Sequence, residues 1–219
     1  MTIFCVIPVH NRKALTRNCL LSLRKLNRDN FTIIVVDDYS TDGTSEMLDE
    51  EFPEVTHLFG DGNLWWSGAM NMGVKYVLGI CKPEDSILAL NDDLEVPEDY
   101  MEKLSTLSEK HQDTLIGSVI VDSKDKTTIL NGGIKQNWWH AKREVFNVNE
   151  KITSFQEGHS HKVSLLTGRG VLIPVKAFRD LGLYRVEHYK QYGDIEFSKR
   201  AERAGYKLIV SYDLIVYSQ

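Results

Sequence analysis

The first half of this sequence alternates apolar runs of strand length with segments that have helical periodicity. The runs cover residues 3–9, 31–38, 55–60 and 86–91, and the helix-like segments cover about 15–26, 41–52, 67–79 and 100–110. Strands that alternate with helices form βαβ units with right-handed crossovers and a parallel sheet. Because the runs are apolar on both faces, helices are expected on both sides of that sheet. The alternation therefore predicts an α/β fold with a mostly parallel, Rossmann-like sheet flanked by helices.

The second half of the sequence is less regular. It predicts a strand at 114–122, helices at about 175–181 and 195–204, and closing strands within 206–218, whereas residues 122–165 show no clear period. No Pro- or Ser-rich linker divides the chain. We therefore expect one domain over residues 1–219, with a regular half to about residue 93 and a more variable half from about 94.

Charge and cysteine content exclude several classes of protein. A net charge of −5 gives no electrostatic reason to expect nucleic acid as a partner. Cys5, Cys19 and Cys81 are scattered, which is typical of small core residues in a reducing compartment rather than of a disulfide set or a zinc site. The apolar run at the N-terminus is too short for a membrane span and lacks the form of a signal peptide. A cytoplasmic chain without a transmembrane segment is expected.

Polar residues follow three of the predicted strands at their carboxyl ends, where open α/β sheets bind ligands. They are His10 after Pro8 and Val9, the pair Asp37 and Asp38, and the group Asn91, Asp92 and Asp93. Two acidic pairs at one sheet edge repel each other unless a positive or hydrogen-bond-donating group lies between them. A nucleoside with a metal-bound diphosphate would supply that group, because Mg²⁺ and Mn²⁺ bind carboxylates and leave positions open for phosphates.

Plainer interpretations of the same residues stay open. Asp93 could open a turn before Pro97, or the acidic pair could be solvated polarity at a strand end. His10 offers a flat face for stacking on a base, but a solvated loop histidine would look the same in the sequence.

Six segments together resemble the family 2 glycosyltransferases of the GT-A fold: "CVIPVHNR", "VVDDYSTDGT", "NLWWSGAMNMG", "LNDDLEVP", "TGRGVLIP" and "YGDIEFSKRAERAGYKL". They occur in the family's order and span nearly the whole chain. The resemblance implies inverting transfer of a sugar from a UDP- or dTDP-sugar to an acceptor hydroxyl, assisted by Mg²⁺ or Mn²⁺. It implies a nucleotide-binding half before about residue 93 and an acceptor-side half after it. The implied setting is synthesis of surface polysaccharide or glycoconjugate on a carbohydrate or lipid-linked saccharide acceptor, in the cytoplasm or peripherally at the inner face of the membrane.

The resemblance also implies roles for single residues in the nucleotide-binding half. Asp93 matches the last acid of the metal motif and would ligate the cation. Asn91 stands where the first acid often sits, so its role shifts towards the ribose, and Asp92 between them is a helper. The residues that would contact base and ribose follow the first two strands: Pro8, Val9, His10, Asp37 and Asp38.

The segment "GNLWWSGAMNMG" matches the Asn- and Gly-rich stretch that precedes the family's third helix. Asn63 is a polar candidate for contact with the nucleotide, and Ser67 to Ala69 would open the helix towards the phosphate with unpaired amide donors. Asn71 is a second polar candidate. Trp65 and Trp66 are either core packing or a wall on which a sugar stacks.

The acceptor half supplies the expected catalytic base. An inverting transfer needs a base that takes the proton of the attacking hydroxyl, and Asp194 stands where the family's catalytic aspartate does. Read without the resemblance, Asp194 is a helix N-cap. The family often has Glu before this Asp, but here the residue is Gly193. Glu196 either pairs with Arg200 one helical turn on or faces the acceptor.

Other candidates lie near the end of the chain. Gly168 and Gly170 would allow close backbone approach to donor sugar and acceptor, and Arg169 is either a ligand contact or a surface arginine. His159 and His161 look like a metal pair, but nothing in the sequence completes a ligand set, so loop residues are expected.

Where many relatives place a histidine ligand after the final strand, this chain has Ser218 and Gln219. We therefore expect either fewer protein ligands for the cation or a chain that lacks a C-terminal segment. Two rival functions remain open, a nucleotide-sugar-binding protein without turnover and a sugar-phosphate nucleotidyltransferase. The second would need a glycine-rich basic loop after the first strand, and "IPVHNRKAL" contains no glycine. A phosphoryl-receiver module fits least, because its acidic pair belongs after the first strand.

Overall fold

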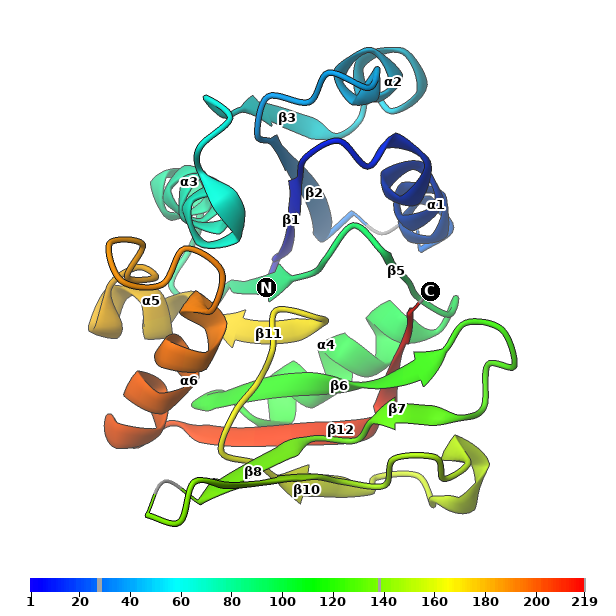
Figure 1. The fold of residues 1–219 in the computed structure, drawn as a ribbon, viewed down its shortest axis with the longest axis vertical. Coiled ribbons are helices and arrows are strands. Elements are labelled where there is room, and N and C mark those ends of the chain that lie inside the picture. The colour runs from blue at the N-terminus through cyan, green and yellow to red at the C-terminus, as the bar shows by residue number, and fades with distance from the viewer. Residues whose placement is uncertain (27–28, 138, 219) are drawn as a thin grey trace.

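The computed structural model describes residues 1–26, 29–137 and 139–218 (Figure 1). Its main sheet has the strand order β10-β12-β6-β11-β4-β1-β2-β3, with β5 paired to β12 and β7 paired to β6. The parallel part consists of β1 (Ile3–Val9), β2 (Phe31–Asp37), β3 (Thr56–Phe59) and β4 (Ser86–Ala89). These are the four strands that the apolar runs predict, so the predicted parallel sheet is confirmed in the first half.

Helices cover both faces of this sheet, as the two-sided apolar runs predict. On one face lie α1 (Lys13–Arg24), α2 (Thr44–Glu51) and α4 (Tyr100–Lys110), and on the other lie α3 (Trp65–Ile80), α5 (Val175–Leu181) and α6 (Gly193–Arg203). Strand β1 shows the reason: Cys5 and Ile7 join the cluster under the first set, whereas Val6 joins the cluster under the second. Alternate residues of a strand point to opposite faces, so both sides of β1 must be apolar.

The second half completes the same sheet with mixed pairing, through β5 (Leu94–Glu95), β6 (Thr114–Asp122), β7 (Ile129–Asn131), β10 (Ser160–Lys162), β11 (Val171–Pro174) and β12 (Lys207–Ser218). Strand β11 is antiparallel to both β4 and β6, and β12 is parallel to β6. Because β11 hydrogen-bonds to strands of both halves, the sheet is continuous. The closing segment is one long strand whose register shifts between Ser211 and Ile215, and not the several strands that the sequence suggested.

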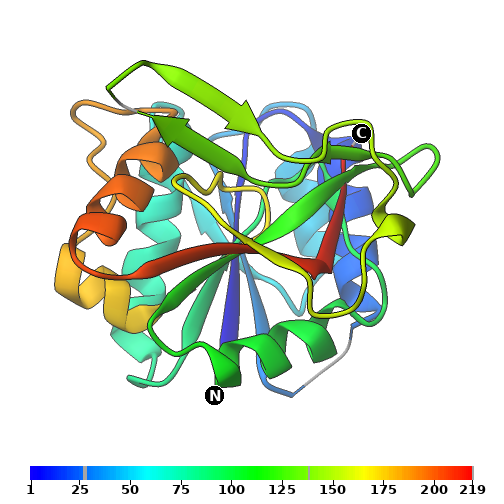
Figure 2. The same cartoon turned by 90° about the horizontal axis from the view of Figure 1, so that it is seen from below.

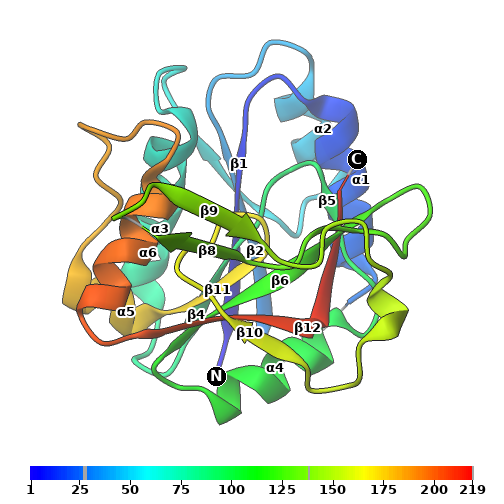
Figure 3. The ribbon, with the colours of Figure 1, turned by 60° about the horizontal axis from the view of Figure 1, so that its bottom comes forward.

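The region 122–165, which showed no period, contains short strands, of which β8 and β9 pair with each other and β10 pairs with the distant strand β12. Strands β8 (Ile134–Asn137) and β9 (Lys142–Val145) form an antiparallel hairpin beside α6, as Figures 2 and 3 show. A short 3₁₀ helix, η1 (Ile152–Ser154), precedes β10. His161 lies in β10 opposite Val210, so the expectation that it is a loop residue is wrong. The pairing depends on a strand about 50 residues further along the chain, which local patterns do not reveal.

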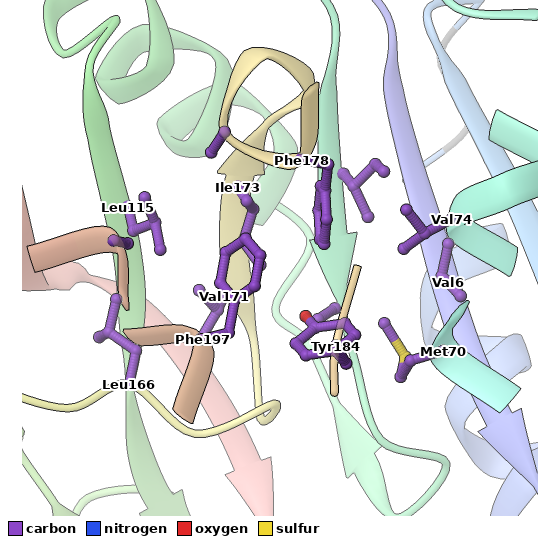
Figure 4. Packing of buried hydrophobic residues seen from close by; sticks show 14 of the residues in the cluster. Val6, Met70, Val74, Leu115, Leu166, Val171, Ile173, Phe178, Tyr184 and Phe197 are labelled. Atoms are coloured by element: carbon purple, nitrogen blue, oxygen red, sulfur yellow. The ribbon is translucent and has the colours of Figure 1, made fainter. Parts of the chain in front are cut away.

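An aromatic cluster joins α5 and α6 to the sheet (Figure 4). The ring centroids of Phe178 and Phe197 lie 4.8 Å apart, and those of Tyr184 and Phe197 lie 5.1 Å apart. These rings are buried with Met70 of α3 and Val171 of β11. The cluster fixes the start of α6 against the sheet, which matters because Asp194 lies there.

Cys5, Cys19 and Cys81 are free thiols, and the first two are buried, as their scattered positions predict. None of the helices within the described ranges combines the length and the apolarity needed to cross a membrane.

Candidate active site

A pocket of about 450 Å³ opens at the carboxyl ends of β1, β2 and β4, and we call it the strand-end pocket. Nine of the residues predicted for the site line it: Pro8, Val9, His10, Asp38, Asn63, Trp65, Trp66, Asn91 and Asp92. Four further wall residues were not among the predicted site residues: Arg12, Gly62, Ala69 and Gln191. Pro8 and Asp92, which are 84 positions apart, meet here because the three strands end at one edge of the sheet.

Asp38 holds one wall of the strand-end pocket in shape. Its carboxylate accepts the backbone N–H of Gly62 at 2.8 Å, of Leu64 at 2.9 Å and of Trp65 at 3.1 Å. Its backbone oxygen lies 2.6 Å from Nδ1 of His10. The side chain is buried, so these bonds fix the turn that leads into α3.

Asp37 does not line the strand-end pocket. Its carboxylate accepts the backbone N–H of Ser40 at 2.9 Å and the hydroxyl of Ser45, and it is almost fully buried. Both oxygens are thus engaged in the turn between β2 and α2. A contact between Asp37 and a nucleotide stays a prediction that this arrangement does not favour.

The two tryptophans have different surroundings. Trp66 is partly buried against Tyr184, with ring centroids 5.4 Å apart, and its indole N–H donates to Oδ1 of Asn91 at 2.9 Å. A Cβ atom on Gly168 would lie 2.0 Å from the Trp66 ring, so only glycine fits at that position. Trp65, by contrast, is 48% exposed, with Nζ of Lys190 5.7 Å from its ring centroid. Packing therefore explains Trp66, whereas the face of Trp65 is available to a ligand.

The start of α3 does not offer the free amide donors that the sequence predicted. The N–H of Ser67 donates to the backbone oxygen of Lys190 at 2.9 Å. The hydroxyl of Ser67 donates to the backbone oxygen of Tyr189 at 2.6 Å. Ser67 is fully buried, so the predicted sugar contact of its side chain is not met in this structure. Asn71 is likewise structural, since its side chain bonds both backbone groups of Tyr184.

An arginine lies between the carboxylates that follow β4. The guanidinium of Arg12 is 3.1 Å from Oδ1 of Asp92 and 3.3 Å from Oδ2 of Asp93. The other oxygens, Oδ2 of Asp92 and Oδ1 of Asp93, are buried and have no hydrogen-bond partner among the residues that the structure describes. Burial raises the pKa of Asp92 to about 6, although Arg12 opposes this rise. Arg12 is the positive group expected between the acidic residues of this sheet edge. Its position in "VHNR", directly after the first strand, is the sequence feature that could have predicted this role.

The residues present fit a divalent cation that is completed by its ligand. Among the residues that the structure describes, no group of three or more His, Cys, Asp or Glu side chains could hold a metal by itself. Mg²⁺, however, is commonly bound by one or two carboxylates together with substrate phosphates and water. The two partnerless oxygens of Asp92 and Asp93 supply such a pair. Gln219, one of the two residues that stand where the resemblance implies a further ligand, lies outside the described residues.

Asp194 is the second residue of α6, and its carboxylate is held on both sides. Oδ2 accepts the N–H of Gly168 at 2.9 Å, and Oδ1 accepts the N–H of Ile195 at 2.8 Å. Burial raises the pKa of this carboxyl above its ordinary value. The N-cap residue of α6 is Tyr192, so Asp194 is not the N-cap, although it does accept one amide of the first turn. The raised pKa is suited to a base.

Gly193, which stands in place of an acid of the family pattern, has a steric reason. A Cβ atom there would lie 2.5 Å from Oγ of Ser67 and 3.2 Å from Cβ of Tyr184. The segment before α6 therefore approaches α3 more closely than a side chain at position 193 would allow.

Glu196 and Arg169 take internal partners. Glu196 binds Arg200 through two contacts of 2.9 and 3.1 Å and lies 3.5 Å from Arg185, so the predicted pair with Arg200 is present. It also lines a larger cleft beside α6. Arg169 donates to the hydroxyl of Ser218 and does not reach the strand-end pocket. Gly170 has a φ of 85°, a backbone conformation that favours glycine.

The model of the family described as glycosyl transferase family 2 matches residues 4–180. Glycosyltransferase AglE of Haloferax volcanii is 25% identical over 217 residues, which cover 96% of this chain and 64% of AglE. The chain thus spans less than two thirds of the length of this relative.

Solved structures share the fold over the whole chain. GalNAc-T7, solved with UDP, GalNAc and Mn²⁺, superposes with a TM-score of 0.77 at 17% identity, over 100% of this chain and 44% of its own. The mannosyltransferase PcManGT of Pyrobaculum calidifontis, in complex with GDP-Man and Mn²⁺, gives a TM-score of 0.69 at 14% identity, over 99% of this chain and 56% of its own. The likeness confirms the GT-A fold that the motifs predict.

Proposed function

Since this chain belongs to glycosyl transferase family 2, we propose that it transfers a sugar from a nucleoside-diphosphate donor to an acceptor hydroxyl, with inversion at the anomeric carbon. One observation carries the proposal for this chain: Asp92 lines the strand-end pocket, Asp93 follows it directly, and among the described residues each of these carboxylates has a buried oxygen without a hydrogen-bond partner. Such oxygens are costly to bury unless a ligand satisfies them. A metal-bound diphosphate would do so, and the Mn²⁺ complexes of two structural neighbours support this choice.

The donor is proposed to lie in the strand-end pocket, with its base against Pro8 to His10 and its diphosphate towards Asp92 and Asp93. A UDP- or dTDP-sugar is proposed, transferring a hexosyl or deoxyhexosyl group during glycan synthesis. A divalent cation held there would offset the charge that develops on the leaving nucleoside diphosphate. Arg12 contacts Oδ1 of Asp92 and Oδ2 of Asp93, whereas the oxygens proposed to ligate the cation are Oδ2 of Asp92 and Oδ1 of Asp93.

Asp194 is proposed as the base. Its carboxylate would take the proton of the acceptor hydroxyl while that oxygen attacks the anomeric carbon. The amides of Gly168 and Ile195 hold the carboxylate in one orientation. Trp66 lines the strand-end pocket and packs against Gly168, which connects this base to the donor site through a single layer of side chains.

Calorimetric titration with UDP and dTDP, each with and without Mn²⁺, tests the proposal on the native chain and on Asp93→Ala. Mn²⁺-dependent binding that is lost in the variant, with metal-free binding unchanged, is the expected result. Glu98→Ala removes an exposed carboxylate that does not line the pocket, so it serves as the control and should leave Mn²⁺-dependent binding unchanged. No binding of either nucleotide under any metal condition would overturn the donor site.

A further inference from the structure

A cleft of about 1300 Å³ lies beside α6, between that helix, the β8–β9 hairpin and the segment 185–192. We call it the basic cleft. Its cationic side chains are Lys135, Lys142, Arg185, Lys199, Arg200 and Arg203. Among the described residues that line it, two carry carboxylates, Glu144 and Glu196, which leaves an excess of four positive charges. The whole chain carries a net charge of −5, so this excess is a strong local reversal of sign.

The cations come from facing walls. Lys142 lies on the hairpin, paired in register with Asn137, and Arg203 lies at the end of α6. Both side chains line the same hollow. Like charges gathered in a concave site raise the local potential and attract an anion.

Three of the six cations have acidic partners and three do not. Arg200 and Arg185 contact Glu196, and Lys199 binds Glu202 at 2.5 Å. The remaining three have no carboxylate oxygen within 4.0 Å in the described part of the chain: Lys135, Lys142 and Arg203. The excess charge is therefore available to a ligand.

Exposed aromatic side chains line the same hollow. Trp139 is 96% exposed, Tyr192 is 66% exposed and Tyr189 is 43% exposed. Large aromatic side chains left in water around a cleft indicate a binding surface. Their flat faces suit sugar rings, whereas the cations suit charged groups between or beside those rings.

The basic cleft adjoins the elements of the proposed reaction. Ile195, the residue after Asp194, lines it, and Tyr189 and Tyr192 line it while Gln191 lines the strand-end pocket. One short segment thus forms a wall of both cavities. Donor and acceptor must meet in this way for a direct transfer between them.

We propose that the basic cleft binds the acceptor, and that the acceptor is a saccharide carrying phosphate groups. This inference rests on the proposed transferase function. Three unpaired cations on facing walls call for a ligand with more than one negative charge within a short span. A phosphodiester-linked glycan or a saccharide on a lipid diphosphate provides such charges, whereas a neutral oligosaccharide provides none.

The test is a calorimetric titration of the full chain, loaded with UDP and Mn²⁺, with four acceptor probes. They are a neutral trisaccharide, a hexuronate trisaccharide, a phosphodiester-linked oligosaccharide and a saccharide on a lipid diphosphate in detergent micelles. At least one of the two phosphate-bearing probes is expected to bind about tenfold or more tightly than the neutral and the hexuronate trisaccharide. The phosphate-bearing probe that binds more tightly identifies the source of the phosphate. Equal binding of the hexuronate or of the neutral probe would overturn the inference.

Matched variants localise the effect. Lys142→Gln with Arg203→Gln removes one unpaired cation from each wall, and about a tenfold loss of affinity for the phosphate-bearing probe is expected. Lys110→Gln with Arg143→Gln removes the same charge from exposed positions outside the cleft and should change that affinity by less than about twofold. Equal losses in both variants would overturn the assignment to the cleft.

Donor titration separates this inference from the proposed function. If UDP with Mn²⁺ binds normally and the phosphate-bearing probes do not, the acceptor inference fails and the donor site stands. If UDP does not bind at all, the proposed function itself fails.

Discussion

The strand-end pocket and the basic cleft differ in how their polar side chains are held. In the pocket, Asp38 accepts three backbone amides and Asn91 accepts the indole N–H of Trp66. In the cleft, Lys135, Lys142 and Arg203 have no carboxylate oxygen within 4.0 Å among the described residues. Groups fixed by internal bonds bind one ligand geometry at little entropic cost, whereas free cations adapt to ligands of varied shape. The contrast suits a defined nucleotide on one side and a more variable saccharide on the other.

The largest expected effect is a loss of transfer activity in Asp194→Asn without a loss of donor binding. Asp194→Asn keeps an oxygen acceptor for an amide but removes the base, so transfer should fall about 10²- to 10⁴-fold. Steady-state kinetics with donor and acceptor measure this, and UDP titration should give an unchanged affinity. Transfer within a few-fold of the native rate would exclude Asp194 as the base.

The second prediction compares one carboxylate from each cavity. Asp38→Ala should lower the free energy of unfolding by about 3 kcal/mol, because each donor left without an acceptor costs about 1–3 kcal/mol. Glu144→Ala removes an exposed carboxylate of the cleft and should cost less than about 0.5 kcal/mol. Urea unfolding of both variants measures the difference. Similar stabilities would show that the pocket wall is no more rigidly held than the cleft.

Salt should act on the two cavities unequally. The Debye length shortens from about 30 Å at 0.01 M to about 10 Å at 0.1 M, so the affinity of a phosphate-bearing probe for the cleft should fall about threefold or more over this range. Binding of uridine, the uncharged nucleoside, should change little. Titrations at the two salt concentrations compare them, and a salt-independent affinity of the phosphate-bearing probe would contradict the role of the unpaired cations.

The smallest expected effect is a shift in the pH profile. Burial raises the pKa of Asp194, and the base is active as the carboxylate, so transfer should decline as the pH falls through this raised pKa. The acidic limb of kcat/KM should therefore lie above about 3.9, the ordinary value for aspartate. The residual activity of Asp194→Asn should lack the limb. A limb that persists in the variant would assign it to another group.

Local sequence patterns predicted the regular half of the fold well. The apolar runs around Ile3–Val9 and Phe31–Asp37 became strands because both of their faces are covered. The strand of His161 was missed because its partner β12 lies about 50 residues further along the chain. The β8–β9 hairpin pairs within one short segment, and it was missed because its strands are mostly exposed and carry no apolar alternation. The strand-end rule likewise brought Asp38 and Asp92 to one pocket.

Tertiary contacts changed the roles of other predicted residues. The amide of Ser67 was expected to be free, but a segment more than 120 residues away supplies its acceptor. Arg12 was part of a quoted motif, yet its function as the counter-ion of Asp92 and Asp93 needed the distances. Side-chain pairing across the chain is not encoded in any single segment, so sequence reasoning identified the edge of the site better than its internal bonds.

The close contact between Gly193 and Ser67 also limits how this chain can change over generations. A carboxylate at position 193 would meet the hydroxyl of Ser67 within 2.5 Å of its first side-chain atom. A lineage that replaces Gly193 by an acidic residue must therefore first shorten the side chain at position 67 or move the segment that it anchors. The order of the two substitutions is fixed by steric contact, and the reverse order passes through a damaged protein.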